Sequence, residues 1–198
     1  MTTLIPNRLT RDDLYTLEQY ASRRNAFRAQ VLAHKKNRTV HLGPHMTLIF
    51  EDRLTVQYQV QEMLRIERIA EASGIEDELA AYNPLIPDGT NLKATLLIEF
   101  PDPQVRAREL ARLQRIEDHL FVEVSGSGRA RAVADEDLDR SNASKTSAVH
   151  FIRFELNETQ IATWRAGAAV SIGVDDERYG HATLLPLSVR SALAMDFA

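Results

Sequence analysis

The chain has 198 residues, with 24 basic and 28 acidic side chains, a formal net charge of −4, 44% hydrophobic residues and no cysteine. These values indicate a soluble globular protein and exclude collagen-like, disordered and disulfide-stapled chains. Without cysteine there is no thiolate nucleophile and no cysteine-bound zinc ion or iron–sulfur cluster. The acidic balance gives no global attraction for nucleic acid, so no nucleic-acid partner is expected unless a local basic patch exists. Since no apolar run reaches about 18 residues, no membrane span is expected.

The length fits a single domain, and the sequence contains no internal repeat. We therefore predict one α+β domain over residues 1–198. The first residues lack the basic segment, apolar stretch and small-residue cleavage site of a secretory signal, which predicts a cytoplasmic location.

The first half of the chain is expected to contain three helices and a pair of strands. Gly43 and Pro44 predict a turn between the two strands, and Gly74 is expected to end the second long helix. In chain order, the expected elements are a helix over residues 11–36, strands over 39–43 and 45–51, and helices over 54–73 and 75–82.

The second half of the chain is expected to supply most of the sheet. From Leu92 to Phe100 every second residue is apolar, which is the period of a strand with one face in the core. In chain order, the expected elements are a strand over residues 92–100, a helix over 103–118, strands over 120–125 and 149–156, a helix over 158–165, a strand over 168–174 and a helix over 189–197. The predicted fold is α+β, with two long N-terminal helices packed with a mostly antiparallel or mixed sheet of five to six strands.

Residues 125–146 are expected to form a mobile loop. Val133 and Leu138 are the large aliphatic residues of this segment, so it has little apolar surface to bury. A solvated surface excursion and an active-site lid or partner-ordered loop both fit this composition.

Charged residues fall on the apolar faces of both long helices. At about 100° per residue, Glu67 lies near the middle of the apolar arc of the second helix, and Arg24 and Arg28 lie within that of the first. A buried carboxylate must be paired, hydrogen-bonded, metal-bound or protonated. We predict that Glu67 pairs with Arg28 or Arg24, and that Glu67→Gln destabilises the fold by about 3 kcal/mol. The alternatives are a functional polar pocket with Glu67 as base or ligand, a dimer interface, and an error in the helical wheel.

The second helix contributes further charged residues to this predicted network. Glu62 lies about 140° from Glu67 around the helix, so these two carboxylates do not form a ready-made pair of metal ligands. The candidates for the buried polar network are Arg24, Arg28, Glu62, Arg65, Glu67 and Arg68.

No catalytic or cofactor-binding motif is present in the sequence. A Gly-rich phosphate loop, a nucleophile elbow and an HExxH zinc motif are all absent. His45, His150 and His181 are the candidate metal ligands, although their spacing does not predict a shared site. His150 alternates with apolar residues in the strand expected over 149–156, so a buried histidine with a satisfied ring nitrogen is the simpler interpretation.

Three runs of the sequence carry a resemblance to a known family. Residues 50–69, 82–87 and 94–99 resemble DUF3501, an uncharacterised bacterial family whose name marks it as a domain of unknown function. The resemblance extends more weakly to Arg24, Arg28, Gly43 and residues 150–154. It supplies no catalytic residue. Genes of this family are often described beside genes for rubrerythrin and iron–sulfur oxidoreductases, so the resemblance implies an accessory role in peroxide or redox handling.

Three functional hypotheses follow from the residues and the resemblance, and the third is nucleic-acid binding through a local basic patch, which predicts a salt-dependent affinity. The first is a non-catalytic accessory or binding protein of a bacterial redox or oxidative-stress system, as a homodimer or with rubrerythrin-like or iron–sulfur partners. The second is a metal-dependent or acid/base enzyme whose pocket uses Glu67, Glu62 and one or more of His45, His150 and His181.

Overall fold

A computed structural model describes residues 8–136, 140 and 145–197 of the chain. Most of its N-terminal half is helical. In chain order, this half contains the 3₁₀ turn η1 (Arg11–Asp13), helix α1 (Leu17–Lys35), strands β1 (Thr39–Leu42) and β2 (Met46–Phe50), helices α2 (Arg53–Glu67) and α3 (Ala72–Tyr82), the turn η2 (Asn83–Leu85) and strand β3 (Asn91–Ile98).

The C-terminal half supplies five further strands. In chain order, it contains helix α4 (Pro103–Arg112), the 3₁₀ turn η3 (Ile116–His119), strands β4 (Leu120–Val124), β5 (Gly128–Ala134) and β6 (Val149–Glu155), helix α5 (Glu158–Arg165), strands β7 (Val170–Val174) and β8 (His181–Leu184), and helix α6 (Leu187–Ala194).

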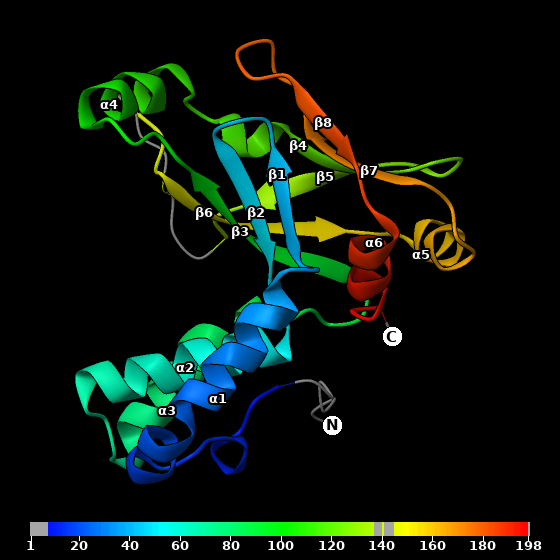
Figure 1. Cartoon of the computed structure of the whole chain (residues 1–198). Helices are drawn as coiled ribbons and strands as arrows, with labels where there is room; N and C mark the ends of the chain where they lie inside the picture. The colour runs from blue at the N-terminus through cyan, green and yellow to red at the C-terminus, as the bar shows by residue number, and fades with distance from the viewer. Residues whose placement is uncertain (1–7, 137–139, 141–144, 198) are drawn as a thin grey trace.

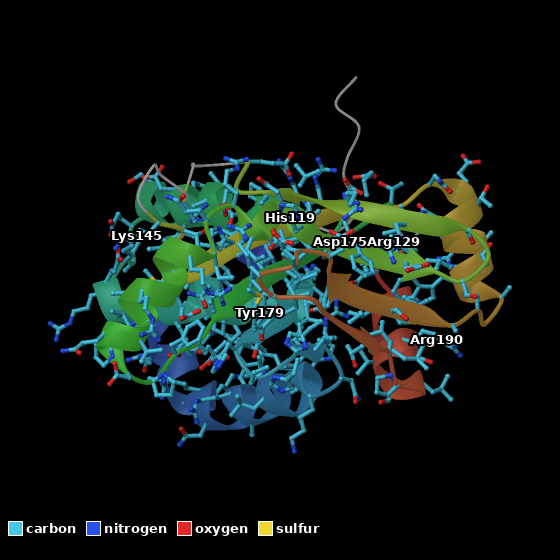
Figure 2. The ribbon with its side chains drawn as sticks, turned by 90° about the horizontal axis from the view of Figure 1, so that it is seen from above. His119, Arg129, Lys145, Asp175, Tyr179 and Arg190 are labelled. Atoms are coloured by element: carbon cyan, nitrogen blue, oxygen red, sulfur yellow. The ribbon has the colours of Figure 1, made fainter. Side chains whose placement is uncertain are left out.

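The eight strands form one antiparallel sheet that curls into a nearly closed barrel (Figure 1). The strand order is β1-β2-β3-β6-β5-β4-β7-β8, and the two edge strands β1 and β8 lie against each other. Tyr179, labelled in Figure 2, ties the two ends together: its hydroxyl donates to the Leu42 carbonyl oxygen (2.7 Å) and accepts from the His45 amide (2.9 Å). Near-closure leaves few strand-edge groups without a partner.

The inward residues of the strands fill the barrel with aliphatic and aromatic side chains. Successive strand residues point to opposite faces, so Leu96 and Ile98 of β3 and Ile152 and Phe154 of β6 are buried inside. The outward residues of the same strands are more exposed. This alternation decides which polar side chains of β6 enter the interior.

Helices α1, α2 and α3 form a separate group beside one end of the barrel (Figure 1). Val56, Val60 and Leu64 of α2 are spaced four residues apart and are buried in a cluster that includes Leu79 of α3. A second cluster, around Phe27 of α1, packs between α1 and α2. In the described part of the chain, no helix combines the length and apolarity needed to cross a bilayer.

The predicted packing of two long N-terminal helices on a five-to-six-stranded sheet is wrong, because the sheet has eight strands and curls into a barrel. Two strands escaped prediction. The inward residues of β5 that pack on the core are the small side chains of Ala130, Ala132 and Ala134, and β8 is exposed along most of its length. Neither strand therefore has the run of large alternating apolar residues that marks a strand in a sequence.

The expected loop over residues 125–146 contains β5 in its first part. Residues 137–139 and 141–144 of that expected loop lie outside the described residues. The mobility of this segment therefore stays a prediction.

The expected helix boundaries also change. The side chain of Thr16 accepts a hydrogen bond from the Gln19 amide (3.2 Å) and so caps α1 after the η1 turn, which divides the predicted helix 11–36. Helix α2 ends at Glu67 because Arg68 adopts a left-handed conformation, with φ 58°. Gly74, the predicted end of this helix, lies inside α3 instead.

Candidate metal centre

The structure brings three of the predicted network residues together between α1 and α2. The Glu62 carboxylate accepts hydrogen bonds from Arg24 Nε (2.7 Å) and Nη2 (2.8 Å), from the Tyr20 hydroxyl (2.7 Å) and from Arg65 Nη2 (3.1 Å). The paired Arg24 guanidinium is the main reason why the pKa of Glu62 falls from 4.5 to about 2. Two cations and a hydroxyl thus surround the Glu62 carboxylate, so its charge and its hydrogen-bonding capacity are matched within the protein.

The predicted burial of Glu67 is wrong. Glu67 is exposed at the last position of α2, and its neighbour Ile66 is 61% exposed, because the chain turns away at Arg68. Arg28 and Arg68 are exposed as well. Among the described residues, no ion pair involves Glu67, so the helical wheel identified the correct face of α2 but extended it beyond the residues that neighbouring helices cover.

Two of the three candidate histidines lie apart from any shared site. The His45 ring stacks on Phe100, with ring centroids 4.1 Å apart, and its Nδ1 lies 3.1 Å from the Glu99 carbonyl oxygen. His181 is exposed and its ring contacts that of Tyr179. The third histidine, His150, lies inside the barrel.

His150 occupies a completely buried position on β6. Its side chain is 0% exposed because it shares the inward face of the strand with Ile152 and Phe154. Ring atom Nδ1 lies 2.6 Å from Asp135 Oδ2. Because an ionised carboxylate only accepts hydrogen bonds, the ring donates its Nδ1 proton to Asp135.

Asp135 follows directly after β5 and turns back towards β6. Its φ of 51° is left-handed, a conformation that aspartate tolerates better than most residues. The Asp135 carboxylate accepts from the Phe151 amide (3.0 Å) and pairs with Arg140 Nη1 (3.3 Å), and its side chain is 7% exposed. These contacts fix the carboxylate against the imidazole ring.

The other ring nitrogen of His150 faces oxygen atoms. Nε2 lies 2.9 Å from Thr146 Oγ1, 3.0 Å from the Ser147 carbonyl oxygen and 3.8 Å from Oε2 of the buried Glu117. The Thr146 hydroxyl donates to the same Glu117 oxygen (2.9 Å). A carbonyl and a carboxylate are acceptors only, so a neutral imidazole would direct the Nε2 lone pair at them unless a proton or a metal cation intervenes.

The distances suit a metal cation. Two ligand atoms that each lie about 2.1 Å from one ion are about 3 to 4 Å apart, and the Nε2 to Glu117 distance falls in this range. One ligand atom from each of Glu117, Asp135 and His150 lies within 4.8 Å of the others, and this is the one such group in the described part of the chain. A carboxylate on the far nitrogen is also the common way in which proteins orient a metal-binding histidine.

Sequence reasoning named His150 but missed its two acidic neighbours. Glu117 was assigned to a helix and Asp135 to a loop, and neither has a fixed spacing from His150. Their proximity depends on the pairing of barrel strands that lie far from each other in the sequence. No local pattern marks the group.

The model of the family "Protein of unknown function (DUF3501)" matches residues 8–197. The chain belongs to this family. Among solved structures, the chain is similar to the crystal structure of a novel protein of unknown function from Burkholderia pseudomallei, with 50% sequence identity and a TM-score of 0.91. The match covers 96% of this chain and 99% of that one. No curated protein matches the chain. The DUF3501 match includes Glu117, Asp135 and His150, so the candidate centre lies within the family domain.

Proposed function

We propose that this DUF3501 protein binds one divalent transition-metal ion inside its barrel. The observation that carries this proposal is the buried Nε2 of His150, which faces Glu117 Oε2 and the Ser147 carbonyl oxygen while Asp135 holds Nδ1. One imidazole nitrogen with several oxygen ligands suits Fe²⁺, Mn²⁺ or Zn²⁺.

Each residue of the centre has a separate role. His150 supplies the nitrogen ligand, and Glu117 supplies the charged oxygen ligand. Asp135 orients the imidazole ring, and Arg140 compensates part of the Asp135 charge. Thr146 Oγ1, within 2.9 Å of both His150 and Glu117, positions these two ligands relative to each other.

A redox-active ion at this position would fit the accessory role that the family resemblance implies. An Fe²⁺ or Mn²⁺ ion held by oxygen and imidazole ligands can take part in peroxide chemistry or electron transfer. We therefore retain, as a proposal, a cytoplasmic accessory protein of a redox or oxidative-stress system with rubrerythrin-like or iron–sulfur partners.

The metal content of the loaded protein tests this proposal. Tag-free protein is incubated anaerobically with Fe²⁺, Mn²⁺ or Zn²⁺, separated from free ions by gel filtration and measured by elemental analysis. We expect about one ion per chain for at least one metal. The His150→Gln variant should lose this ion, whereas the control His45→Gln should retain it because His45 lies outside the centre.

A stability measurement supplements the metal count. A bound ion at a free concentration of about 100 times its Kd should raise the unfolding free energy by about 2.7 kcal/mol. Asp135→Asn keeps the side-chain shape and should weaken metal binding at least tenfold, which provides a second variant if His150→Gln does not fold. The proposal is contradicted if no metal binds the wild-type chain, or if His150→Gln binds as much metal as the wild type.

A further inference from the structure

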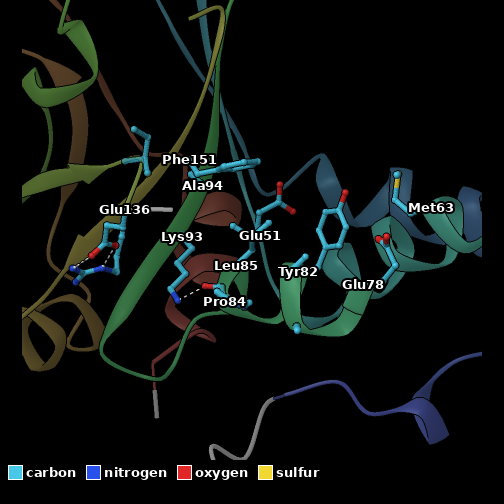
Figure 3. Close-up of a pocket in the computed structure, with 14 residues that line it drawn as sticks. Glu51, Met63, Glu78, Tyr82, Pro84, Leu85, Lys93, Ala94, Glu136 and Phe151 are labelled. Carbon is cyan, nitrogen blue, oxygen red and sulfur yellow. Dashed lines mark hydrogen bonds and ion pairs between the residues drawn. The ribbon is translucent and has the colours of Figure 1, made fainter. Parts of the chain in front are cut away.

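A pocket lies on the outside of the barrel, where α2 and α3 face strands β3 and β6 (Figure 3). Its volume is about 750 Å³, within the range of about 300 to 1,000 Å³ that small-molecule sites occupy. Phe151 and Arg153 line it, whereas His150 points into the barrel, because neighbouring residues of β6 face opposite sides of the sheet. The pocket is therefore distinct from the candidate metal centre.

Apolar side chains form most of the pocket wall. Tyr82 projects from the end of α3, Leu85 from the η2 turn, Met63 from α2 and Phe151 from β6. These four residues come from four different elements and enclose a space that suits an apolar molecular body.

Lys93 supplies a cation at one end of this apolar space. Its ammonium group donates a hydrogen bond to the Pro84 carbonyl oxygen, which engages one of its three protons. Among the described residues, no carboxylate lies within ion-pair distance of Lys93. Burial lowers the pKa of this amine, and the charges of Asp88, Glu136 and Glu155 oppose this shift only in part.

The neighbouring Arg153 shows the opposite situation. Its guanidinium donates to both carboxylate oxygens of Glu136 (2.8 and 2.9 Å) and to Glu155 (2.5 Å). Arg153 is therefore already satisfied within the protein. Lys93 is the pocket cation that retains donors for a ligand.

The carboxylates that line the pocket do not pair with Lys93. Glu51 accepts hydrogen bonds from the hydroxyls of Thr55 (2.6 Å) and Thr95 (2.8 Å), and Glu136 is paired with Arg153. At the far end of the pocket, burial together with the negative charges of neighbouring acidic residues raises the pKa of Glu78. This arrangement of charges therefore favours a ligand whose anionic group lies at Lys93 and whose remaining atoms lie further along the pocket.

We propose that this pocket binds a small organic acid, with its carboxylate on Lys93 and its apolar body against Tyr82, Leu85 and Phe151. An anionic group at this position would give the half-buried ammonium an ion-pair partner in addition to the Pro84 carbonyl oxygen. The proposal concerns a second site and stands independently of metal binding in the barrel.

Calorimetric titration with three probes of equal chain length tests this proposal. The probes are octanoate, 1-octanol and octylamine, which each have eight carbon atoms and carry an anionic, a neutral and a cationic head group, respectively. We expect saturable one-to-one binding of octanoate, weaker binding of octanol and the weakest binding of octylamine. Equal or tighter binding of octylamine, or no saturable binding of octanoate, overturns the proposal.

Substitutions at Lys93 identify the site of binding. Lys93→Met keeps the length of the side chain and removes its charge, and we expect the octanoate affinity to fall at least tenfold. Lys93→Arg keeps the charge and should retain more of the affinity than Lys93→Met. The control Lys36→Met alters an exposed lysine at the end of α1 and should leave the affinity unchanged. An unchanged affinity in folded Lys93→Met overturns the proposal, with circular dichroism as the check on folding.

Discussion

The protein contains two polar clusters that differ in how their charges are arranged. Between α1 and α2, a single carboxylate, Glu62, receives hydrogen bonds from Arg24, Arg65 and Tyr20. Inside the barrel, a single imidazole, His150, lies between two carboxylates. In the first cluster, the charges of the two helices are paired with each other. In the second, His150 Nε2 faces oxygen acceptors, an arrangement that favours binding of a cation.

Solvent access separates the two clusters further. The side chains of Glu62 and Arg24 are 14% and 31% exposed, so water screens part of their interaction. His150 is fully enclosed in the barrel, where an unsatisfied polar group costs far more. Removal of a charged partner should therefore lower the free energy of unfolding more in the barrel than between the helices.

Loss of Asp135 should give the largest effect. Asp135→Ala removes the acceptor for His150 Nδ1 and for the Phe151 amide, and it leaves Arg140 without this carboxylate. We expect the unfolding free energy of metal-free protein to fall by about 3 kcal/mol, measured by urea denaturation. The control Asp12→Ala, at an exposed position of η1, should change it by less than about 0.5 kcal/mol. Equal effects of the two variants would show that the buried Asp135 contributes no more to stability than an exposed carboxylate.

An intermediate effect is expected at Glu62. Glu62→Gln keeps the shape of the side chain but removes the negative charge shared by Arg24 and Arg65. Because this cluster is partly exposed, we expect the unfolding free energy at pH 7 to fall by about 1 to 2 kcal/mol. A loss as large as that of Asp135→Ala would show that the helix cluster is as costly to disturb as the one in the barrel.

The same variant should show a characteristic pH dependence. The pKa of Glu62 is about 2 in the folded protein against an ordinary value of 4.5, so folding favours its ionised form. The stabilisation is complete above pH 4.5 and is lost as the pH falls towards 2. The difference in unfolding free energy between wild type and Glu62→Gln should therefore be smaller at pH 3 than at pH 7. A difference that does not vary with pH would argue against the Arg24 pairing as its source.

The smallest effect is expected at Glu67. This carboxylate is exposed at the end of α2, so Glu67→Gln should change the unfolding free energy by less than about 0.5 kcal/mol at pH 7. Urea denaturation beside Glu62→Gln, five residues earlier on the same helix, makes the comparison direct. A loss of 3 kcal/mol would instead restore the sequence-based prediction of a buried Glu67.

The sequence predicted those strands whose inward residues are large and apolar. Strands β3 and β6 alternate clearly and lie where this alternation places them, whereas β5 offers mainly alanines to the interior and β8 offers little buried surface. Barrel closure depends on these two strands. For this reason the local patterns predicted a sheet of only five to six strands.

The candidate centre was predictable only in part. The alternation around His150 placed it on the inward face of its strand, but Glu117 and Asp135 reach it from η3 and from the end of β5. Glu67 illustrates the opposite error, because a helical wheel has no information about where a neighbouring helix stops covering the surface. Both the group around His150 and the exposure of Glu67 depend on contacts between residues that are far apart in the sequence.

Anomalous X-ray scattering from crystals grown with Mn²⁺, Fe²⁺ or Zn²⁺ tests the central claim most directly. We expect a single strong peak in the barrel, at bonding distance from both His150 Nε2 and Glu117 Oε2. Occupied peaks confined to surface groups such as His45 or His181, with none beside His150, would contradict it.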